Sequence, residues 1–352
     1  MMSMNNKKII IADIKTLSPD GINIGGHPIA VANNYMEIFR ERCIVAGGYA
    51  ITHNFPVSQT ITLPYCINHD SLLSKLKIFI NAIVLFRKGR NQIIVLQQST
   101  TITSFLCIAL FYHCHSKLFL IQYNLEGFRS RVGKLLFKLA KRKINGILCP
   151  YDMIGDAFQG IPFCTLPDYI YTGNAQQTEI PYSKRKYDIC VVGRISPEKG
   201  VIEVARHYAK TKYHIVIAGK PQNEKIAKQL ESACEGAENI KLHLGLIPNE
   251  EYYGYLRNSK YALLNYSEVY SERSSGVVFD TLFNGVPILG KKCNALYFIS
   301  ENQLGGLYDC IENLDTESFF QEDIHNRLVC NIRIYRKSLN SFINKLYSFL
   351  TQ

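Results

Sequence analysis

The stretch YDICVVGRISPEKG, residues 187 to 200, contains an apolar run, a glycine, two cations and a proline turn. The run from Ile189 to Val192 is typical of a buried strand, and the glycine and proline predict a turn into a helix. Arg194 and Lys199 then lie on a loop at the carboxyl end of the strand. Arginine offers a planar fork and lysine a point charge for phosphate oxygens, so the pair indicates an anion site. Either cation alone is better explained as a solvated loop side chain.

A second stretch, ERSSGVVFDTLFNGVPILG at residues 272 to 290, places Glu272 and Asp280 around a turn of small residues that leads into an apolar helix. Free amides and the dipole at a helix start favour a diphosphate. Ser274, Ser275 and Gly276 supply those amides, and the two acids can accept hydrogen bonds from a sugar and a ribose diol. The alternative is that Ser274 is an N-cap and both acids are solvated. Because the basic pair accompanies the acids, the sequence favours a clamp for a sugar nucleotide.

Together these stretches resemble the glycosyltransferase family 4 type of GT-B glycosyltransferase, over the C-terminal half of the chain. The family's strand-end segment reads roughly G-R-x-x-x-x-K-G, which is matched by Gly193, Arg194, Lys199 and Gly200. Its second mark is Glu-x7-Glu followed by a small-residue helix and G-x-P. That mark falls on Glu272, Asp280, Gly285 and Pro287, with Asp280 in place of the second glutamate. An aspartate keeps two acceptor oxygens but is one methylene shorter.

The resemblance implies roles for these residues. Arg194 and Lys199 would bind the donor diphosphate, Glu272 the sugar hydroxyls and Asp280 the ribose. Ser274, Ser275 and Gly276 would meet the phosphate, the last two through backbone amides, and HLGLIPNEEYYGYLRNS (243–259) would form the nucleobase pocket. The resemblance also implies same-face attack with retention, in which a donor phosphate oxygen takes the acceptor proton. We expect no metal and no cofactor, since no D-x-D is found.

The N-terminal half carries weaker signals. Gly25 and Gly26 precede an apolar helical pattern, and glycines there let a backbone approach a ligand. The resemblance gives them a contact with the donor phosphate. His27 is a candidate for the acceptor side or a polar helix-start residue. The family's usual histidine after a mid-domain strand is absent, and Gln122 and Asn124 follow the corresponding strand instead. They can donate the same hydrogen bond without a charge.

Repeated alternation of strand and helix patterns predicts an α/β protein of GT-B architecture, with two doubly wound Rossmann-like parallel-sheet domains facing a central cleft. A chain of 352 residues fits two domains. We predict an acceptor domain at 1–172, a linker at 173–186 and a nucleotide-sugar domain at 187–323. The residues at 324–352 are predicted to be helical and to return to the first domain. Ligands bind such sheets outside the carboxyl ends of the strands.

The net charge is +11, with a strongly basic stretch at 129–143. As a helix this stretch has a basic face and an apolar face, which suits either an anionic inner-membrane surface or packing on the core with a solvated cationic side. No nucleic-acid partner is expected, since no zinc-finger, RNP or helix-turn-helix pattern accompanies the charge. The eleven cysteines are scattered with no C-x-x-C, which does not suggest a disulfide framework. No apolar run reaches the length of a membrane span, so we expect a cytoplasmic protein, peripheral at most.

The sequence thus predicts a retaining glycosyltransferase that uses a nucleotide-sugar donor. The acceptor expected from the resemblance is a lipid-linked saccharide of O-antigen, capsule or lipopolysaccharide biosynthesis. Two other classes share some of these features. A sugar-nucleotide epimerase of the same fold would need no acceptor, and a non-enzymatic nucleotide- or nucleic-acid-binding protein would leave the acids unused. Neither explains why the acids and the basic pair occur in register.

Overall fold

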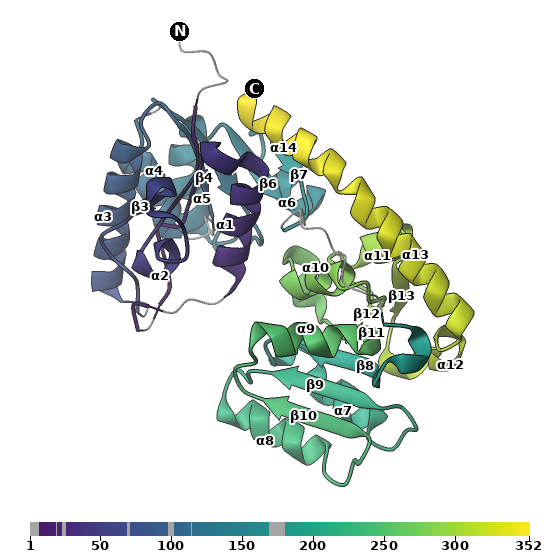
Figure 1. The fold of residues 1–352 in the computed structure, drawn as a ribbon. Coiled ribbons are helices and arrows are strands. Elements are labelled where there is room, and N and C mark those ends of the chain that lie inside the picture. The colour runs from purple at the N-terminus through teal and green to yellow at the C-terminus, as the bar shows by residue number, and fades with distance from the viewer. Residues whose placement is uncertain are drawn as a thin grey trace. The chain divides into compact units, whose positions relative to one another are not determined.

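The computed structural model describes residues 7–18, 20–22, 26–68, 71–97, 102–113, 115–168 and 180–352. Gly25, Cys114 and residues 173–179 of the expected linker lie outside these ranges. The chain divides into two compact units. The first unit is Met1–Thr172 with Asn340–Gln352, and the second unit is Gly173–Leu339. Each contains one parallel sheet with helices on both faces (Figure 1).

The first unit is built on a seven-stranded parallel sheet in the order β3-β2-β1-β4-β5-β6-β7. Its strands are β1 (Ile9–Ala12), β2 (Cys43–Gly47), β3 (Thr60–Thr62), β4 (Ile93–Leu96), β5 (Lys117–Ile121), β6 (Gly146–Cys149) and β7 (Phe163–Thr165). Every residue of β1, β4 and β6 is buried. Continuous apolar runs of this kind form strands that are covered on both faces, and such strands can be predicted from the sequence.

The helices of the first unit cover opposite faces of the sheet because the strand order reverses between β1 and β4 and the crossovers are right-handed. One face carries α1 (Gly26–Phe39) and α14 (Asn340–Thr351), and the other carries α3 (Leu72–Lys88), α4 (Ile102–Phe111), α5 (Arg131–Ala140) and α6 (Asp152–Ala157). Short helical segments complete the unit: α2 (Tyr49–Thr52), η2 (Arg40–Arg42), η3 (Val57–Gln59) and η4 (Lys141–Lys143).

The basic stretch at 129–143 is helical as predicted. Ser130 caps α5, since its hydroxyl accepts a hydrogen bond from the Gly133 amide at 2.9 Å. Phe137 packs in the core between Phe105 and Phe158, with ring centroids 5.5 and 5.3 Å apart. Among the described helices, none combines the length and the apolar character that crossing a bilayer requires.

The second unit is built on a six-stranded parallel sheet in the order β10-β9-β8-β11-β12-β13. Its strands are β8 (Tyr187–Val192), β9 (Ile215–Gly219), β10 (Ile240–Leu244), β11 (Ser259–Leu264), β12 (Ile288–Lys291) and β13 (Gly305–Tyr308). Its helices are α7 (Val201–Tyr208), α8 (Glu224–Ala233), α9 (Asn249–Arg257), α10 (Gly276–Phe283), α11 (Tyr297–Glu301), α12 (Thr316–Phe319) and α13 (Glu322–Ser338). Its short 3-10 turns are η5 (Tyr182–Lys184), η6 (Pro197–Lys199), η7 (Glu268–Glu272) and η8 (Ile311–Asn313).

The C-terminal segment is helical, as its pattern predicts, but its division differs from the expected one. Helix α13 belongs to the second unit, and the residues grouped with the first unit begin at Asn340 and not at 324. Within the first unit, Phe349 of α14 lies against Phe119 of β5, with ring centroids 5.5 Å apart. The fold class is confirmed as α/β with two doubly wound parallel sheets.

Candidate functional site

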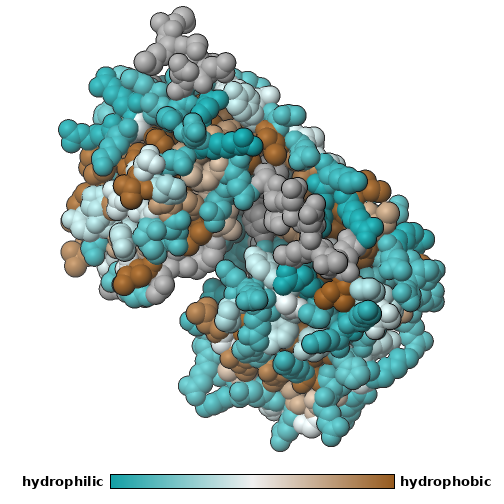
Figure 2. Space-filling view, in the orientation of Figure 1, coloured by the Kyte–Doolittle hydropathy of each residue, from teal (hydrophilic) through white to brown (hydrophobic). Residues whose placement is uncertain are grey.

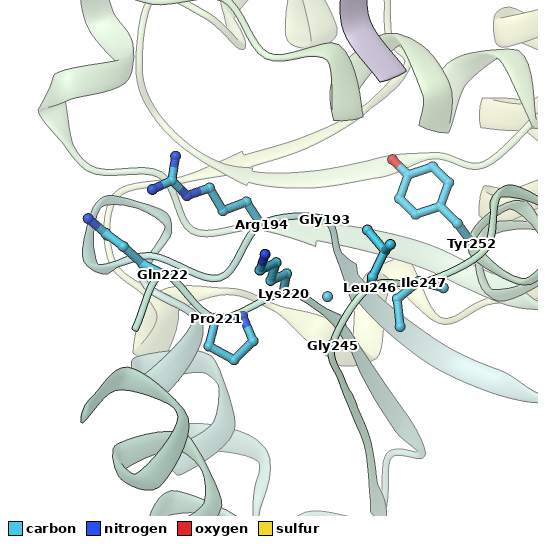
Figure 3. A pocket seen from close by; sticks show the side chains of 10 residues that line it. Gly193, Arg194, Lys220, Pro221, Gln222, Gly245, Leu246, Ile247 and Tyr252 are labelled. Atoms are coloured by element: carbon cyan, nitrogen blue, oxygen red, sulfur yellow. The ribbon is translucent and has the colours of Figure 1, made fainter. Parts of the chain in front are cut away.

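A cavity of about 440 Å³ lies in the second unit at the carboxyl ends of β8, β9 and β10. This volume falls in the range of small-molecule and cofactor sites. Figure 3 shows Arg194, Lys220 and Gln222 toward one end of the cavity and Leu246, Ile247 and Tyr252 toward the other. The cavity is therefore polar and cationic at one end and mostly apolar at the other.

The floor of the cavity is backbone, because β9 ends in Gly219 while Gly193 and Gly245 directly follow β8 and β10. The Gly193 amide donates to the Ala218 carbonyl at 3.0 Å, and the Gly245 amide donates to the Gly219 carbonyl at 2.9 Å. A Cβ on Gly219 would lie 1.7 Å from the Gly193 carbonyl oxygen. Gly193 also has a φ of +98°, a conformation that side chains disfavour. Glycines at these two positions let two strand ends approach and leave the space above them open.

The basic loop after β8 supplies two cations. Arg194 is exposed and lines the cavity, whereas Lys199 is half-buried at the end of η6. The Lys199 ammonium lies 5.8 Å from the centre of the Tyr266 ring. Burial lowers the pKa of Lys199 to about 8, and Arg194 lowers it further, while Glu198 and Asp280 oppose the shift. Lys199 is thus a cation that is poorly solvated before any anion arrives.

Helix α10 begins beside the same strand end. Ser275 is its N-cap residue by backbone position, so the alternative in which Ser274 caps the helix is wrong. The Ser275 hydroxyl hydrogen-bonds the Tyr266 hydroxyl at 2.7 Å and makes no cap bond. Val277 meets Gly193 closely, since a Cβ on Gly193 would lie 3.0 Å from its Cγ2. The Gly276 and Val277 amides at this helix start precede the first helical hydrogen bond, which the Val278 amide donates to the Ser275 carbonyl at 3.1 Å, and such amides favour an anion.

Asp280 on α10 is hydrogen-bonded to a tyrosine that lines the cavity. The Tyr252 hydroxyl donates to Asp280 Oδ2 at 2.8 Å, and Tyr252 lines the apolar end of the cavity. Neither Tyr252 nor Gln222 was singled out in the sequence. Tyr252 is one of four tyrosines between residues 252 and 261, and nothing in the sequence distinguishes it from the other three. The hydrogen bond gives the shorter aspartate a fixed orientation.

The acid before the turn, Glu272, is the half-buried last residue of η7. This turn is joined to the basic loop, because the Ser267 amide donates to the Glu198 carbonyl at 2.9 Å and Arg273 lies 3.8 Å from the Glu198 carboxylate. Of the residues predicted for the donor, Gly193 and Arg194 line the cavity itself. The others in the second unit lie on the two adjoining segments: Lys199, Glu272, Ser274, Ser275, Gly276 and Asp280. Gly26 belongs to the first unit, at the start of α1.

The candidate residues of the first unit lie at the start of α1 and on the segment after β5. Gly26 is the first residue of α1, and the His27 ring packs edge-on against Tyr123 with centroids 4.8 Å apart. In the sequence, Tyr123 lies between the two predicted polar residues, Gln122 and Asn124. Gln122 is fully buried, and its backbone amide donates to the Leu148 carbonyl at 2.8 Å. Asn124 Oδ1 accepts from the Glu126 amide at 3.0 Å, so part of its side chain orders the turn.

A polar pair beside them was not predicted. Asp13 follows β1 and Gln97 follows β4, at the point where the strand order reverses and such sheets bind ligands. Both side chains are at most 2% exposed. Burial raises the pKa of Asp13 to about 6, although a hydrogen bond from the Lys15 amide lowers it in part. Within the described part of the chain, neither amide atom of the Gln97 side chain has a hydrogen-bond partner. Such a group is costly to bury and suits a polar ligand.

Among the described residues, no group of three or more His, Cys, Asp or Glu side chains is arranged to hold a metal ion. The ten described cysteines are free thiols.

Comparisons with known proteins rest on structure. No family model matches the sequence, and no curated protein matches it. The structure resembles a glycosyltransferase from Rickettsia africae at a TM-score of 0.68 and 13% identity, covering 98% of each chain. It also resembles an E. coli trehalose-6-phosphate structure bound with UDP-2-fluoro glucose, at a TM-score of 0.68 and 10% identity, over 98% of this chain and 99% of the other.

A third similar structure is TarM, at a TM-score of 0.57 and 17% identity. That match covers 78% of this chain but 58% of TarM, so the chain spans less than two thirds of that relative. These likenesses show that the chain has the GT-B fold, as the sequence predicted.

Proposed function

We propose that the chain is a retaining glycosyltransferase that moves a sugar from a nucleoside-diphosphate sugar to an acceptor hydroxyl. The observation that carries this proposal is the cavity at the ends of β8, β9 and β10. The basic loop lines its rim, and Val277 of α10 packs against the Gly193 floor. Arg194 in the cavity, with Lys199 and the start of α10 on adjoining segments, supports the proposal of an anion site here. The fold's likeness to a structure bound with UDP-2-fluoro glucose supports a nucleotide-sugar donor.

The two ends of the cavity suit the two parts of a nucleotide. Leu246, Ile247 and Tyr252 provide an apolar end for the base. Asp280, whose Oδ2 accepts a hydrogen bond from the Tyr252 hydroxyl, would accept hydrogen bonds from the ribose diol. At the other end Arg194 would hold the diphosphate, with Lys199 and the amides of Ser275 and Gly276 beside it.

The chemistry follows from where charge develops. The bond between the sugar's anomeric carbon and the diphosphate oxygen breaks, and a bond to the acceptor oxygen forms on the same face. The acceptor proton goes to a donor phosphate oxygen. Arg194, Lys199 and the α10 amides stabilise the growing negative charge on the leaving diphosphate, which is where preorganised donors act most strongly. Glu272 would fix the sugar through its hydroxyls.

The first unit would present the acceptor. His27 packs on Tyr123, which lies between Gln122 and Asn124 in the chain, and Gly26 begins α1 directly after Gly25 in the sequence. Asp13 and Gln97 add two buried polar groups at the adjoining strand ends. The acceptor we propose is a lipid-linked saccharide of bacterial surface-polysaccharide assembly, such as O-antigen, capsule or lipopolysaccharide. The enzyme would then work at the cytoplasmic face of the inner membrane, with the basic 129–143 helix toward the lipid.

The test is a panel of nucleotide sugars scored by thermal unfolding of the intact protein. A donor that binds only the folded state raises the melting temperature. We expect one nucleotide sugar to stabilise the wild type and not Arg194→Ala, while Lys225→Ala on the exposed face of α8 behaves as wild type. Release of the nucleoside diphosphate only when an acceptor is present would support transfer. Interconversion of donor sugars without an acceptor would show an epimerase instead.

A further inference from the structure

The positive charge of the chain is concentrated in one segment. Residues 71–145 contain thirteen Lys or Arg and a single acid, Glu126, a formal charge of +12 against +11 for the whole chain. The remainder of the chain is therefore almost neutral. This segment forms β4 and β5 and three successive helices on one face of the first sheet: α3, α4 and α5.

Helix α5 has two exposed faces in addition to its buried one. Val132, Leu135 and Leu139 repeat at helical spacing and are between 55% and 60% exposed. The apolar face predicted from the sequence is thus divided, because Phe137 faces the core and this stripe faces solvent. The exposed cations Arg131, Lys134 and Lys138 run beside the stripe. The helix therefore offers an apolar strip with a parallel row of positive charge.

The neighbouring helices extend this surface. Leu72, Leu73 and Leu76 on α3 are between 55% and 83% exposed, and Leu110 on α4 is 55% exposed. The helices pack side by side: the Phe79 ring of α3 lies 5.9 Å from that of Phe111 of α4, and Lys143 after α5 donates to the Ala109 carbonyl at 2.7 Å. Figure 2 shows hydrophobic atoms separated by hydrophilic ones along the edge of the first unit where Figure 1 places α3.

Helix stability does not account for the cations near the starts of α3 and α5, although the helix dipole does favour Arg87, Lys88 and Lys138 in the last turns. The first turns of α3 and α5 contain no acid, although the helix dipole favours acids there. Lys75 on α3 and Arg131 and Lys134 on α5 lie near the helix starts, where a positive charge is unfavourable. Exposed cations that lower helix stability are better explained by contact with an external partner than by a role in folding.

A second cavity adds a basic recess to the same layer. It has a volume of about 420 Å³ and lies where α3 and α4 end. Arg87, Arg90, His113 and His115 line it together with Phe86 and Phe111, and none of its described lining residues is acidic. Cations over apolar walls suit a phosphate that carries an apolar group.

We propose that the outer surface of α3, α4 and α5 docks on an anionic lipid bilayer, with lipid phosphates entering the recess at the ends of α3 and α4. The proposal rests on the proposed function, since a lipid-linked acceptor would be held by that bilayer. Leucines would enter the headgroup region while the cations meet anionic lipids. A second copy of the chain is a poor occupant, because two surfaces of the same strong charge repel.

The experiment is flotation of the full chain with vesicles, without donor or acceptor. We expect binding to vesicles of equal parts phosphatidylcholine and phosphatidylglycerol and little binding to phosphatidylcholine alone. Lys134→Gln with Lys138→Gln should weaken binding about twenty-fivefold, at about fivefold for each cation. Leu135→Ser with Leu139→Ser should weaken it at least about tenfold, since two partly buried leucines are lost. The matched control is Lys225→Gln with Lys228→Gln on α8, which should bind as wild type.

Equal binding of wild type to both kinds of vesicle, or unchanged binding of both double variants, would overturn the proposal. So would a stable dimer in sedimentation that the leucine variant abolishes while vesicle binding is absent. If excess inorganic phosphate does not reduce vesicle binding, the result supports a surface that binds lipid and not free phosphate. Donor-induced stabilisation is measured separately, so a failure of docking leaves the proposed transfer reaction standing.

Discussion

If Lys199 binds the donor diphosphate as proposed, its low pKa makes donor affinity depend on pH, and the size of the effect can be calculated. Burial holds its pKa at about 8 in the empty site, far below the usual lysine value. A bound diphosphate favours the charged ammonium and so raises that pKa. If the bound-state pKa lies well above the range tested, donor affinity falls about tenfold between about pH 7 and pH 9. The affinity falls because at high pH the Lys199 amine must take up a proton before it can bind the anion.

The assay is calorimetric titration of the stabilising nucleotide sugar across this pH range. The nucleotide-sugar diphosphate is a diester and stays fully ionised throughout, so its own charge does not change. Lys199→Met should bind more weakly at neutral pH and show a flat profile. Lys225→Met on α8 should retain the wild-type profile. A wild-type affinity that does not change with pH, or a pH dependence that survives in Lys199→Met, would refute the role of Lys199 as a phosphate-binding cation.

The same shift has a consequence for folding, and its sign is opposite to that of a salt-bridged lysine. Between about pH 8 and the normal lysine pKa, the unfolded chain binds more protons at this position than the folded one. The free energy of unfolding of the empty protein therefore gains a contribution as pH rises through this window. Lys199→Met should lack that gain in denaturant titrations.

Three further substitutions test the site. Arg194→Ala should lower turnover about tenfold or more with the fold intact, since one preorganised donor is lost; a near-normal rate would contradict this. Tyr252→Phe should weaken donor binding about fivefold, the loss of one hydrogen bond to Asp280, and calorimetry that detects no change would leave that bond without a role. Gly219→Ala should destabilise the second unit by about 3 kcal/mol in denaturant unfolding, because its methyl group would overlap the Gly193 carbonyl. A stable Gly219→Ala protein would contradict the described strand approach.

Much of the fold was predictable because its strands are buried on both faces. The runs near residues 9, 93 and 146 contain almost no polar residue, and each is a strand. The strand β13 could not be predicted, because its sequence, GGLY, carries hardly any apolar periodicity. Its glycines are required by packing that the sequence does not display. A Cβ on Gly305 would lie 1.8 Å from the Ile288 carbonyl, and one on Gly306 would overlap Phe319.

The candidate site was predictable where residues follow a strand directly. Arg194 and Lys199 could be placed on one loop from their spacing alone. Tyr252 and Asp280 could not be paired from sequence, because their hydrogen bond joins two helices 28 positions apart. Asp13 and Gln97 illustrate the same difficulty. Each follows a buried strand, but their adjacency depends on β1 pairing with β4, and strand order is set by packing and not by local pattern.

The donor site is best tested by a crystal structure of the full chain with the nucleoside diphosphate that stabilises it most. We expect the base to lie between Leu246, Ile247 and Tyr252, and the diphosphate to lie within hydrogen-bond distance of Arg194 and Lys199. A nucleotide bound elsewhere, or phosphates that contact neither cation, would contradict the assignment of this cavity as the donor site.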